Sequence, residues 1–397
     1  MSTEATVRAR RAWPIGHSER GISLIELLVG IAIGLLSILA VFQTLAVWNR
    51  HTQTTASGSE AQSAGTLAMF DIERDIKQAG LGFGTAASAV LGCNVAANDT
   101  ATARAFTFPM APVVIAANAT PGAPDQISVL YGNSSFFVSA QPFTSSTVAS
   151  KQLVRRNGFQ PGDLALVADG AGSCALVEIT GNANPDGVTV NHGIGAYTSV
   201  YQAASAASTI ARFNTPAGTG ASFPSGGTMY SMGPQPTYST WLAASGANSA
   251  SMLRTELIFG GAPLDVADGV INLKAEYGYD ADGNGQISDA EWTAILPVPA
   301  DMTLVLAVRV GVLVRSGQFE HSKDPSTGVP SATTTAAPTW ADGSAAHTFL
   351  MTNVDGTADA FTGAGVNTLD PNNWRFYRYR VYERVIPLRN MLWGTLP

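Results

Sequence analysis

The most regular hydrophobic pattern of the chain lies near its N-terminus. Residues 21–42 read GISLIELLVGIAIGLLSILAVF, and after Glu26 no charged residue follows until Arg50. This stretch is long enough for a helix that enters or crosses a lipid bilayer. Residues 1–20 are polar and carry arginines, and the positive-inside tendency keeps such a flank in the cytoplasm. The pattern predicts one membrane helix, with the rest of the chain outside the cytoplasm.

A cleavable secretory signal and a plain membrane anchor are alternative interpretations of this helix. A cleavable signal needs a small-x-small site after the apolar run, and Val41, Phe42 and Gln43 do not provide a clean one. Neither alternative explains Glu26, because an uncompensated carboxylate in an apolar helix is costly. The sequence therefore implies a partner for the charge of Glu26.

Helical spacing continues beyond the apolar run. Apolar residues recur at this spacing at Met69, Ile72, Ile76 and Ala79. Charged residues are expected on other faces of the helix, at Asp71, Arg74, Asp75 and Lys77. Glycines at positions 80, 82 and 84 then end the pattern. We predict one long helix over about residues 22–78, interrupted near Ser57 and Gly58.

The rest of the chain shows the patterns of strands. Alternating or β-branched apolar runs cover residues 126–130, 164–168, 271–279, 304–314 and 376–386. In the last of these, one side of the strand is expected to carry Tyr377, Tyr379, Val381 and Val385. Stretches rich in Gly, Ala, Ser and Thr, at about 181–251 and 326–370, are expected to be surface loops or excursions. The chain is therefore predicted to be α+β.

Composition and charge narrow the function classes. The chain has 397 residues, 46% hydrophobic and 13% charged, which suffices for the core of one or two domains. Its net charge of −7 argues against general nucleic-acid binding. Five arginines near the C-terminus are interpreted as the solvated side of a strand, with an acidic partner surface or nucleic acid as alternatives. These are Arg375, Arg378, Arg380, Arg384 and Arg389.

No sequence motif indicates catalysis. The chain has no G-x-S-x-G elbow, no H-E-x-x-H and no phosphate-binding glycine loop with lysine. Its histidines are scattered, at positions 17, 51, 192, 321 and 347. We expect no catalytic residues and no enzymatic activity.

The chain has two cysteines, Cys93 and Cys174. Two are too few for a disulfide scaffold or a zinc site, but in an oxidising compartment they are candidates for one bridge. Such a bridge closes a long loop and contributes about 4 kcal/mol by loop-entropy arithmetic. Two buried free thiols are the alternative.

The sharpest local motif is DADGNGQISDAE, at residues 280–291. It fits the calcium-loop pattern, in which carboxylates at positions one, three and twelve supply oxygen ligands and a glycine at position six permits a sharp turn. The predicted ligands of one calcium ion are Asp280, Asp282, Asn284, the carbonyl of Gln286, Ser288 and Glu291. Because a strand precedes the loop, we expect EF-hand-like ligation without the helix-loop-helix; an acidic hairpin turn is the alternative.

The run from Gly21 to Glu26, GISLIE, resembles the processing site of type IV prepilins. The resemblance implies that a prepilin peptidase cuts after Gly21 and methylates the new amino terminus at Ile22, where the family usually has Phe. Glu26 is then the fifth residue of the mature chain. In the family this glutamate is thought to pair with the free amino terminus of a neighbouring subunit, and a buried pair is tolerable where a lone charge is not.

Four further stretches resemble the PilW-like minor pilins. They read MFDIERDIKQAGLGFG, LKAEYGYDADGNG, RVGVLVRSG and YRVYERVIPLRN. The resemblance implies a type IV pilin-like fold with a leader peptide at residues 1–21 and a long N-terminal helix at 22–80. The membrane and filament-core part of that helix is expected at about 22–48, and the helix is expected to pack on an antiparallel β-rich body at 81–397.

The same resemblance implies a structural role as a minor pilin that helps initiate or cap a type IV pilus. The expected partners are prepilin peptidase, other minor and major pilins and a large tip adhesin. The chain is expected to cross the inner membrane once, with its body in the periplasm, and to reach the pilus or cell surface after assembly. A minor pseudopilin of a type II secretion system and a surface-binding adhesion module are the alternative functions.

Overall fold

The computed structural model describes residue 21 and residues 23–135, 139–155, 158–182, 187–202, 208–215, 223, 226–246, 249–296, 301–320, 326–358 and 369–394. Residues 1–20 of the predicted leader and Ile22, the predicted first mature residue, lie outside the described residues. The chain divides into two compact units, Met1–Thr55 and Ala56–Pro397. Each unit is described by itself.

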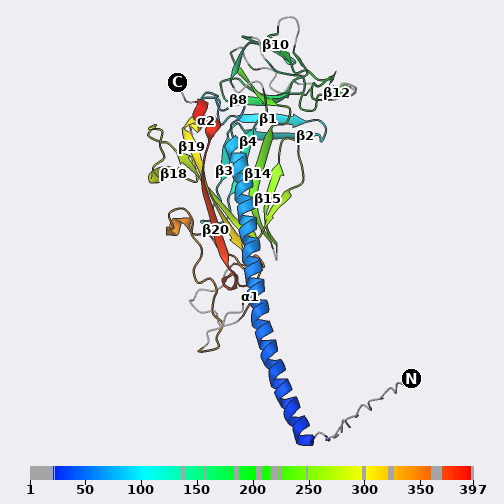
Figure 1. The fold of residues 1–397 in the computed structure, drawn as a ribbon. Helices are drawn as coiled ribbons and strands as arrows, with labels where there is room; N and C mark the ends of the chain where they lie inside the picture. Colours follow the sequence, from blue (N-terminus) through cyan, green and yellow to red (C-terminus); the bar gives the residue numbers. More distant parts are fainter. Residues whose placement is uncertain are drawn as a thin grey trace, which may run out of the picture. The chain divides into compact units, whose positions relative to one another are not determined.

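Helix α1 runs over Leu24–Gln78 without a break, so it belongs to both units (Figure 1). The predicted interruption near Ser57 and Gly58 is wrong. One glycine inside a helix costs only about 1 kcal/mol, which is too little to end a helix that continues on both sides. In the first unit α1 is long and apolar enough to cross a membrane, and its large apolar side chains are exposed from Leu24 to Trp48.

In the second unit the last part of α1 is packed into the body. Ile72 and Ile76 are fully buried, as the helical spacing predicts. The helix ends at Gln78, and the glycines that follow adopt positive φ angles of 81° at Gly80 and 96° at Gly82. Glycine is the residue that reaches this region without strain, so the predicted C-terminal end of the helix is confirmed.

One large sheet of the body has nine strands in the order β2-β1-β8-β7-β13-β5-β6-β10-β9. Its strands are β1 Asn94–Asp99, β2 Arg104–Pro109, β5 Gln141–Ser146, β6 Ser150–Leu153, β7 Leu164–Ala168, β8 Ser173–Glu178, β9 Gly181–Asn182, β10 Thr189–Asn191 and β13 Thr228–Gly233. Neighbouring strands are antiparallel except β1 and β8, which are parallel.

Two further sheets are fully antiparallel, with the orders β16-β15-β14-β4-β3 and β18-β17-β19-β20. The five-stranded sheet consists of β3 Val113–Ala116, β4 Gln126–Tyr131, β14 Thr237–Gly246, β15 Ser249–Glu256 and β16 Leu264–Asp268. The four-stranded sheet consists of β17 Val270–Tyr279, β18 Trp292–Thr293, β19 Val305–Arg315 and β20 Tyr379–Pro387. With α1 these sheets make the chain α+β, as predicted.

Short elements complete the described part of the body. They are the strand pair β11 Ala196–Tyr197 and β12 Thr209–Ile210, the 3-10 turns η1 Asp289–Glu291, η2 Met302–Leu304, η3 Ala345–His347 and η4 Trp374–Phe376, and helix α2 Arg389–Gly394. The main hydrophobic core joins α1 to all three large sheets. Fully buried members of this core include Ile72, Leu166, Trp241 and Val310.

The strands predicted at 126–130, 164–168, 271–279, 304–314 and 376–386 are confirmed as β4, β7, β17, β19 and β20. The prediction of surface loops over 181–251 is wrong where it covers β13, β14 and the start of β15. Tyr230 and Trp241 on these strands are buried. Most neighbouring residues are small, so the sequence resembles a low-complexity loop. A few large side chains nevertheless anchor these strands in the core.

The loop prediction for 326–370 is also only partly correct in the described residues. This segment has little regular structure, but Trp340 and Phe349 are buried in a core of their own. Strand β20 differs from its prediction as well. Tyr379 and Val381 pack against that small core, whereas Val385 is 55% exposed because the strand extends beyond it.

Candidate functional site

The N-terminal end of α1 carries the residues predicted for processing and assembly. Gly21 is exposed, and Ile22 lies outside the described residues. Glu26 is exposed in the first turn of α1 and makes no ion pair with another residue that the structure describes. An acidic side chain is favourable at this end of a helix because of the helix dipole. The geometry leaves the Glu26 carboxylate accessible to a second molecule.

A buried carboxylate joins the last part of α1 to the five-stranded sheet. Oδ2 of Asp75 accepts hydrogen bonds from Ser239 Oγ at 2.9 Å and Trp241 Nε1 at 3.2 Å. Arg254 Nε donates to the same oxygen at 3.1 Å, and the Tyr131 hydroxyl donates to Oδ1 at 3.1 Å. The Asp75 side chain is 0% exposed. Donors from β4, β14 and β15 therefore hold one carboxylate of the helix.

The prediction that Asp75 lies on a polar face of the helix is wrong, and the network around it was not predicted. The signal was its spacing, because Asp75 lies three residues after Ile72 and four before Ala79, on the face that these residues bury. Burial, together with the nearby Asp75 charge, raises the pKa of the Tyr131 hydroxyl. A buried carboxylate with a cationic partner and three further donors fixes the position of the helix on the sheet.

The predicted calcium loop follows β17 and ends in the single turn η1. Carboxylate oxygens of Asp280, Asp282 and Glu291 lie within 4.8 Å of one another. The Asp280 carboxylate accepts from the backbone of Asn284 at 3.0 Å and of Gly285 at 2.8 Å. Gly285 has a φ of 79°, which is the sharp turn that the motif requires at its sixth position.

The other predicted ligands turn toward the loop's own backbone. Asn284 Oδ1 accepts from the Gln286 amide at 2.8 Å. Glu291 Oε2 accepts from the Ser288 amide and hydroxyl, both at 2.8 Å, and these contacts lower the pKa of the Glu291 carboxyl. The loop thus gathers three carboxylates at one point and is preceded by a strand, as expected. Its occupancy by calcium stays a prediction.

The loop is connected to the four-stranded sheet through Trp292, the residue after Glu291. The Arg309 guanidinium lies 4.7 Å from the centre of the Trp292 ring and forms an ion pair with Glu276. Oε1 of Glu276 lies 2.9 Å from Nε2 of His347, whose Nδ1 lies 2.6 Å from Oδ1 of Asp342. A chain of polar contacts therefore runs from the loop into the segment around η3.

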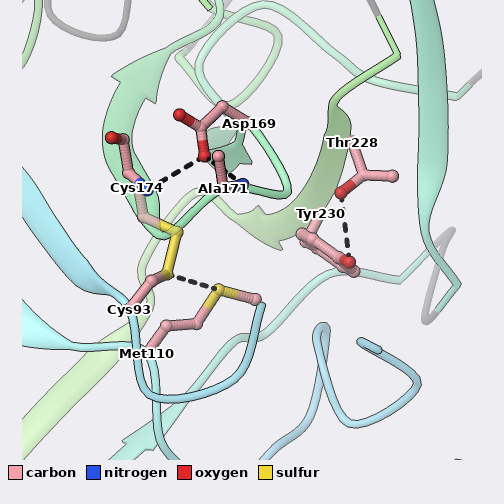
Figure 2. The surroundings of a disulfide bond; sticks show 8 residues. Cys93, Met110, Asp169, Ala171, Cys174, Thr228 and Tyr230 are labelled. Carbon is pink, nitrogen blue, oxygen red and sulfur yellow. Dashed lines mark hydrogen bonds between the residues drawn. A yellow bond between two sulfur atoms is a disulfide. The ribbon is translucent and has the colours of Figure 1, made fainter. Parts of the chain in front are cut away.

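Cys93 and Cys174 are joined by a disulfide bond across 81 positions of the sequence. Cys93 directly precedes β1 and Cys174 lies in β8, the two strands that pair in parallel. Both cysteines are buried, and Met110 Sδ lies 3.9 Å from Cys93 Sγ (Figure 2). The bridge therefore links β1, the first strand after α1, covalently to its parallel neighbour β8 in the nine-stranded sheet.

A buried amine occupies the end of the same sheet. Lys151 is 0% exposed, and its Nζ donates to the Thr147 carbonyl at 3.1 Å and lies 3.0 Å from His192 Nε2. Burial lowers the pKa of Lys151 to about 8 and, with the Lys151 charge, that of His192 to about 3. At pH 7 the Lys151 ammonium donates a hydrogen bond to Nε2 of the neutral His192 ring. Both side chains are closed off from solvent.

The C-terminal arginines have mixed surroundings. Arg378 Nε pairs with Glu320 at 2.5 Å, and Arg384 Nε lies 3.6 Å from Glu73 on α1. Arg380 on β20 is exposed and makes no ion pair with another described residue. The prediction of a solvated side is correct for Arg380 and for the 59% exposed Arg384.

Comparison with known proteins adds one finding. The model of the type IV pilus-assembly protein W family matches residues 241–390. Residues 241–390 are PilW-like. No curated protein and no solved structure shows significant similarity to the chain. The resemblance over this region implies a part in type IV pilus assembly.

The PilW-like region contains much of the candidate site. It begins at Trp241 and includes Arg254, the calcium loop and strand β20. Asp75 and the disulfide lie outside it. The PilW-like region therefore supplies two of the side chains that hold the end of α1, Trp241 and Arg254.

Proposed function

We propose that this chain is a minor pilin of a type IV pilus, processed by prepilin peptidase between Gly21 and Ile22, that helps initiate or cap the pilus. The observation that carries the proposal is the uninterrupted helix α1. Its first part exposes a mainly apolar surface, and its last part is packed into a body that is PilW-like over residues 241–390. A type IV pilin-like fold has this division of one helix.

The exposed first part of α1 needs a cover that the described residues do not provide. From Leu24 to Trp48 the large apolar side chains are 50–75% exposed, which is far more contiguous apolar surface than a soluble monomer carries. The inner membrane covers it before assembly and neighbouring pilin helices cover it afterwards. The body then lies in the periplasm and later on the pilus.

Glu26 is the residue through which the helix joins the pilus. Its carboxylate lies near the N-terminus of α1 and makes no ion pair within the described residues. The methylated amino terminus of a neighbouring subunit is the proposed partner, because it supplies the charge that makes a carboxylate tolerable among apolar helices. The remaining proposed partners are other minor and major pilins and a large tip adhesin.

The match to a pilus-assembly family favours this role over a pseudopilin of type II secretion. One calcium ion bound at the loop 280–291 is part of the proposal, supported by the convergence of Asp280, Asp282 and Glu291. Millimolar extracellular calcium is sufficient even for a weak site of this kind. The proposed role is structural, without catalysis.

The test compares pilus formation in a strain that lacks the gene with strains complemented by variants. Wild type and Ser23→Ala should restore sheared pili and give a mature N-terminus at Ile22 by N-terminal sequencing. Gly21→Glu should leave the leader attached and fail to restore pili. Normal piliation of the deletion strain, or a mature terminus at another residue, would overturn the proposal.

A second variant separates assembly from processing. Glu26→Ala should be cut at the same bond and remain a stable membrane protein, because its partner is a neighbour rather than its own body. It should be missing from purified pili. Recovery of Glu26→Ala in pili at the wild-type level contradicts the proposed pairing.

A further inference from the structure

One face of the four-stranded sheet is covered by residues 338–351, which we call the cover segment. Alternate residues of β19 point to this face. A Cβ at Gly311 would lie 2.7 Å from the Trp340 ring, and Leu313 packs against Trp340 in the same small core. The opposite face of β19, with Val312, belongs to the main core. The cover segment therefore keeps the fully buried Leu313 out of water.

One histidine joins the cover segment to the sheet. His347 ends η3, and its Nε2 lies 2.9 Å from Oε1 of Glu276 on β17. Its Nδ1 lies 2.6 Å from Oδ1 of Asp342, within the cover segment, and 3.0 Å from Ser344 Oγ. The His347 ring stands edge-on to the Trp340 ring, with 5.3 Å between their centres. Each ring nitrogen of His347 thus faces a carboxylate oxygen.

Only a doubly protonated His347 ring satisfies both contacts. A carboxylate accepts hydrogen bonds and donates none, and a neutral imidazole has a single N–H, whereas the imidazolium donates from both nitrogens. The Asp342 carboxyl is ionised, because its contacts with Ser344 and with His347 lower its pKa to about 2. Glu276 forms an ion pair with Arg309. Two carboxylate acceptors therefore require two N–H donors from one ring.

The charges around His347 balance only when the ring is cationic. Among the described residues, Glu276 and Asp342 are the carboxylates in contact with the ring, and Arg309 is the cation beside them. Arg309 is held against the Trp340 ring, 5.6 Å from its centre. An imidazolium sets two positive charges against two negative ones. A neutral ring leaves one carboxylate uncompensated beside a side chain that is only 17% exposed.

We propose that His347 is a pH-sensitive latch that holds the cover segment on the four-stranded sheet. Histidine is the side chain that ordinarily changes charge between pH 5 and 8, so the latch is closed at the acidic end of this range and weakened at the alkaline end. Loss of the proton turns the ion pair with Glu276 into a hydrogen bond from a neutral ring, and the 61% exposed Asp342 side chain turns to water. The cover segment then opens more often and uncovers Leu313.

Hydrogen–deuterium exchange of the full-length chain in detergent micelles tests the latch. The amides of Trp340, Phe349 and Leu350 donate to backbone carbonyls, so a peptide over residues 338–351 reports opening of the cover segment. After correction for the intrinsic exchange rate at each pH, the protection of this peptide should fall about tenfold from pH 5.5 to pH 8.5, as expected when a charge-assisted hydrogen bond weakens. The protection of β7, in the nine-stranded sheet, should not fall.

Three variants assign the effect to His347. His347→Gln keeps an amide donor near Glu276 but cannot change charge, so it should remove the pH dependence of exchange over residues 338–351. Asp342→Asn should make the pH dependence smaller than in the wild type, because the amide can donate to a neutral ring. Asp355→Asn is the matched control. Asp355 accepts from the Thr357 amide at 3.0 Å in the same type of turn, so this variant should keep the full change.

Equal protection of the cover segment at both pH values would overturn the proposal, as would an unchanged tenfold fall in His347→Gln. A fall that includes β7 would show unfolding of the whole body and would count against the latch as well. If His347→Gln does not fold, the other two variants decide. Equal pH dependence in Asp342→Asn and Asp355→Asn then means that His347 does not hold the cover segment.

Discussion

The two parts of α1 have the same secondary structure and opposite surroundings. From Leu24 to Trp48 the large apolar side chains are exposed, whereas Ile72 and Ile76 are fully buried and Asp75 is held by four donors. The partner of the last part is in the same chain. The first part has no such partner among the residues that the structure describes. The local sequence therefore determines that α1 is helical. The role of each part depends on which surface covers it.

Removing one carboxylate from each part of α1 should give the largest difference between them. Asp75→Ala should lower the free energy of unfolding of residues 56–397 by about 4 kcal/mol, because it leaves the partly buried Arg254 without its counter-ion. Glu26→Ala in the full chain should leave the melting of the body unchanged. Urea unfolding followed by tryptophan fluorescence measures the first effect.

Asp71→Ala is the matched control, since Asp71 pairs only with the exposed Arg74 at 3.4 Å. Its cost should stay below about 1 kcal/mol. If Asp75→Ala is no more destabilising than Asp71→Ala, the buried network does not hold the helix on the sheet.

Calcium should stabilise the body, which lies in residues 56–397, and leave the first part of α1 unaffected. At a hundredfold excess over Kd, one ion adds about 2.7 kcal/mol to the free energy of unfolding. Melting curves of residues 56–397 with calcium and with chelator measure this, and magnesium should have little effect. Glu291→Ala should abolish the difference, whereas its neighbour Asp289→Ala should keep it. Equal melting temperatures of the wild type with calcium and with chelator would show that the loop is an acidic turn that binds no calcium.

Acid should weaken the body through His192. Burial holds its folded-state pKa at about 3, below the ordinary 6.5, so the unfolded chain binds a proton that the folded chain does not. Stability from this group is complete above pH 6.5 and falls as the pH drops toward 3, by about 2 kcal/mol at pH 5. His192→Gln should show a smaller loss between pH 7 and 5 in urea titrations. An identical loss would assign the acid sensitivity to other groups.

Two glycines in the last part of α1 give the smallest and most local test. A Cβ at Gly65 would lie 2.1 Å from the ring of Tyr382, whereas a Cβ at Gly58 meets nothing within 4 Å. Gly65→Ala should therefore destabilise residues 56–397 by about 1–3 kcal/mol through overpacking. Gly58→Ala should stabilise them by about 0.5–1 kcal/mol through helix propensity. Equal effects of the two substitutions would mean that Tyr382 does not pack on the helix.

The elements with strong periodicity could be predicted from the sequence. The apolar run before Trp48 and the alternation of β17 and β19 depend on neighbours close in the chain, so their patterns are visible locally. Strand β14 was missed because Trp241 lies among Ala, Ser and Thr, and its burial depends on α1, far away in the sequence. The calcium motif is local, so the convergence of its three carboxylates followed from the sequence.

The network around Asp75 could be anticipated only in part. The spacing of Asp75 relative to Ile72 indicates a buried face, but no local pattern identifies Arg254 or Ser239 as its partners. Contacts between residues so distant in sequence depend on how the sheets stack. The contact of His347 with the sheet was missed for the same reason, since His347 and Glu276 come together only in the folded body.

The disulfide has a consequence when the chain is under tension. In the proposed role as a pilin, pulling on the pilus transmits force along α1 into the body. Cys93 is the first residue after the helix that is covalently bound to a distant part of the chain. Once α1 has been pulled free, the segment from Cys93 to Cys174 cannot extend, because its ends are locked together across 81 positions. At about 3.4 Å per residue, the bridge prevents roughly 280 Å of chain extension. The bridge thus shortens the length that the body can release under load.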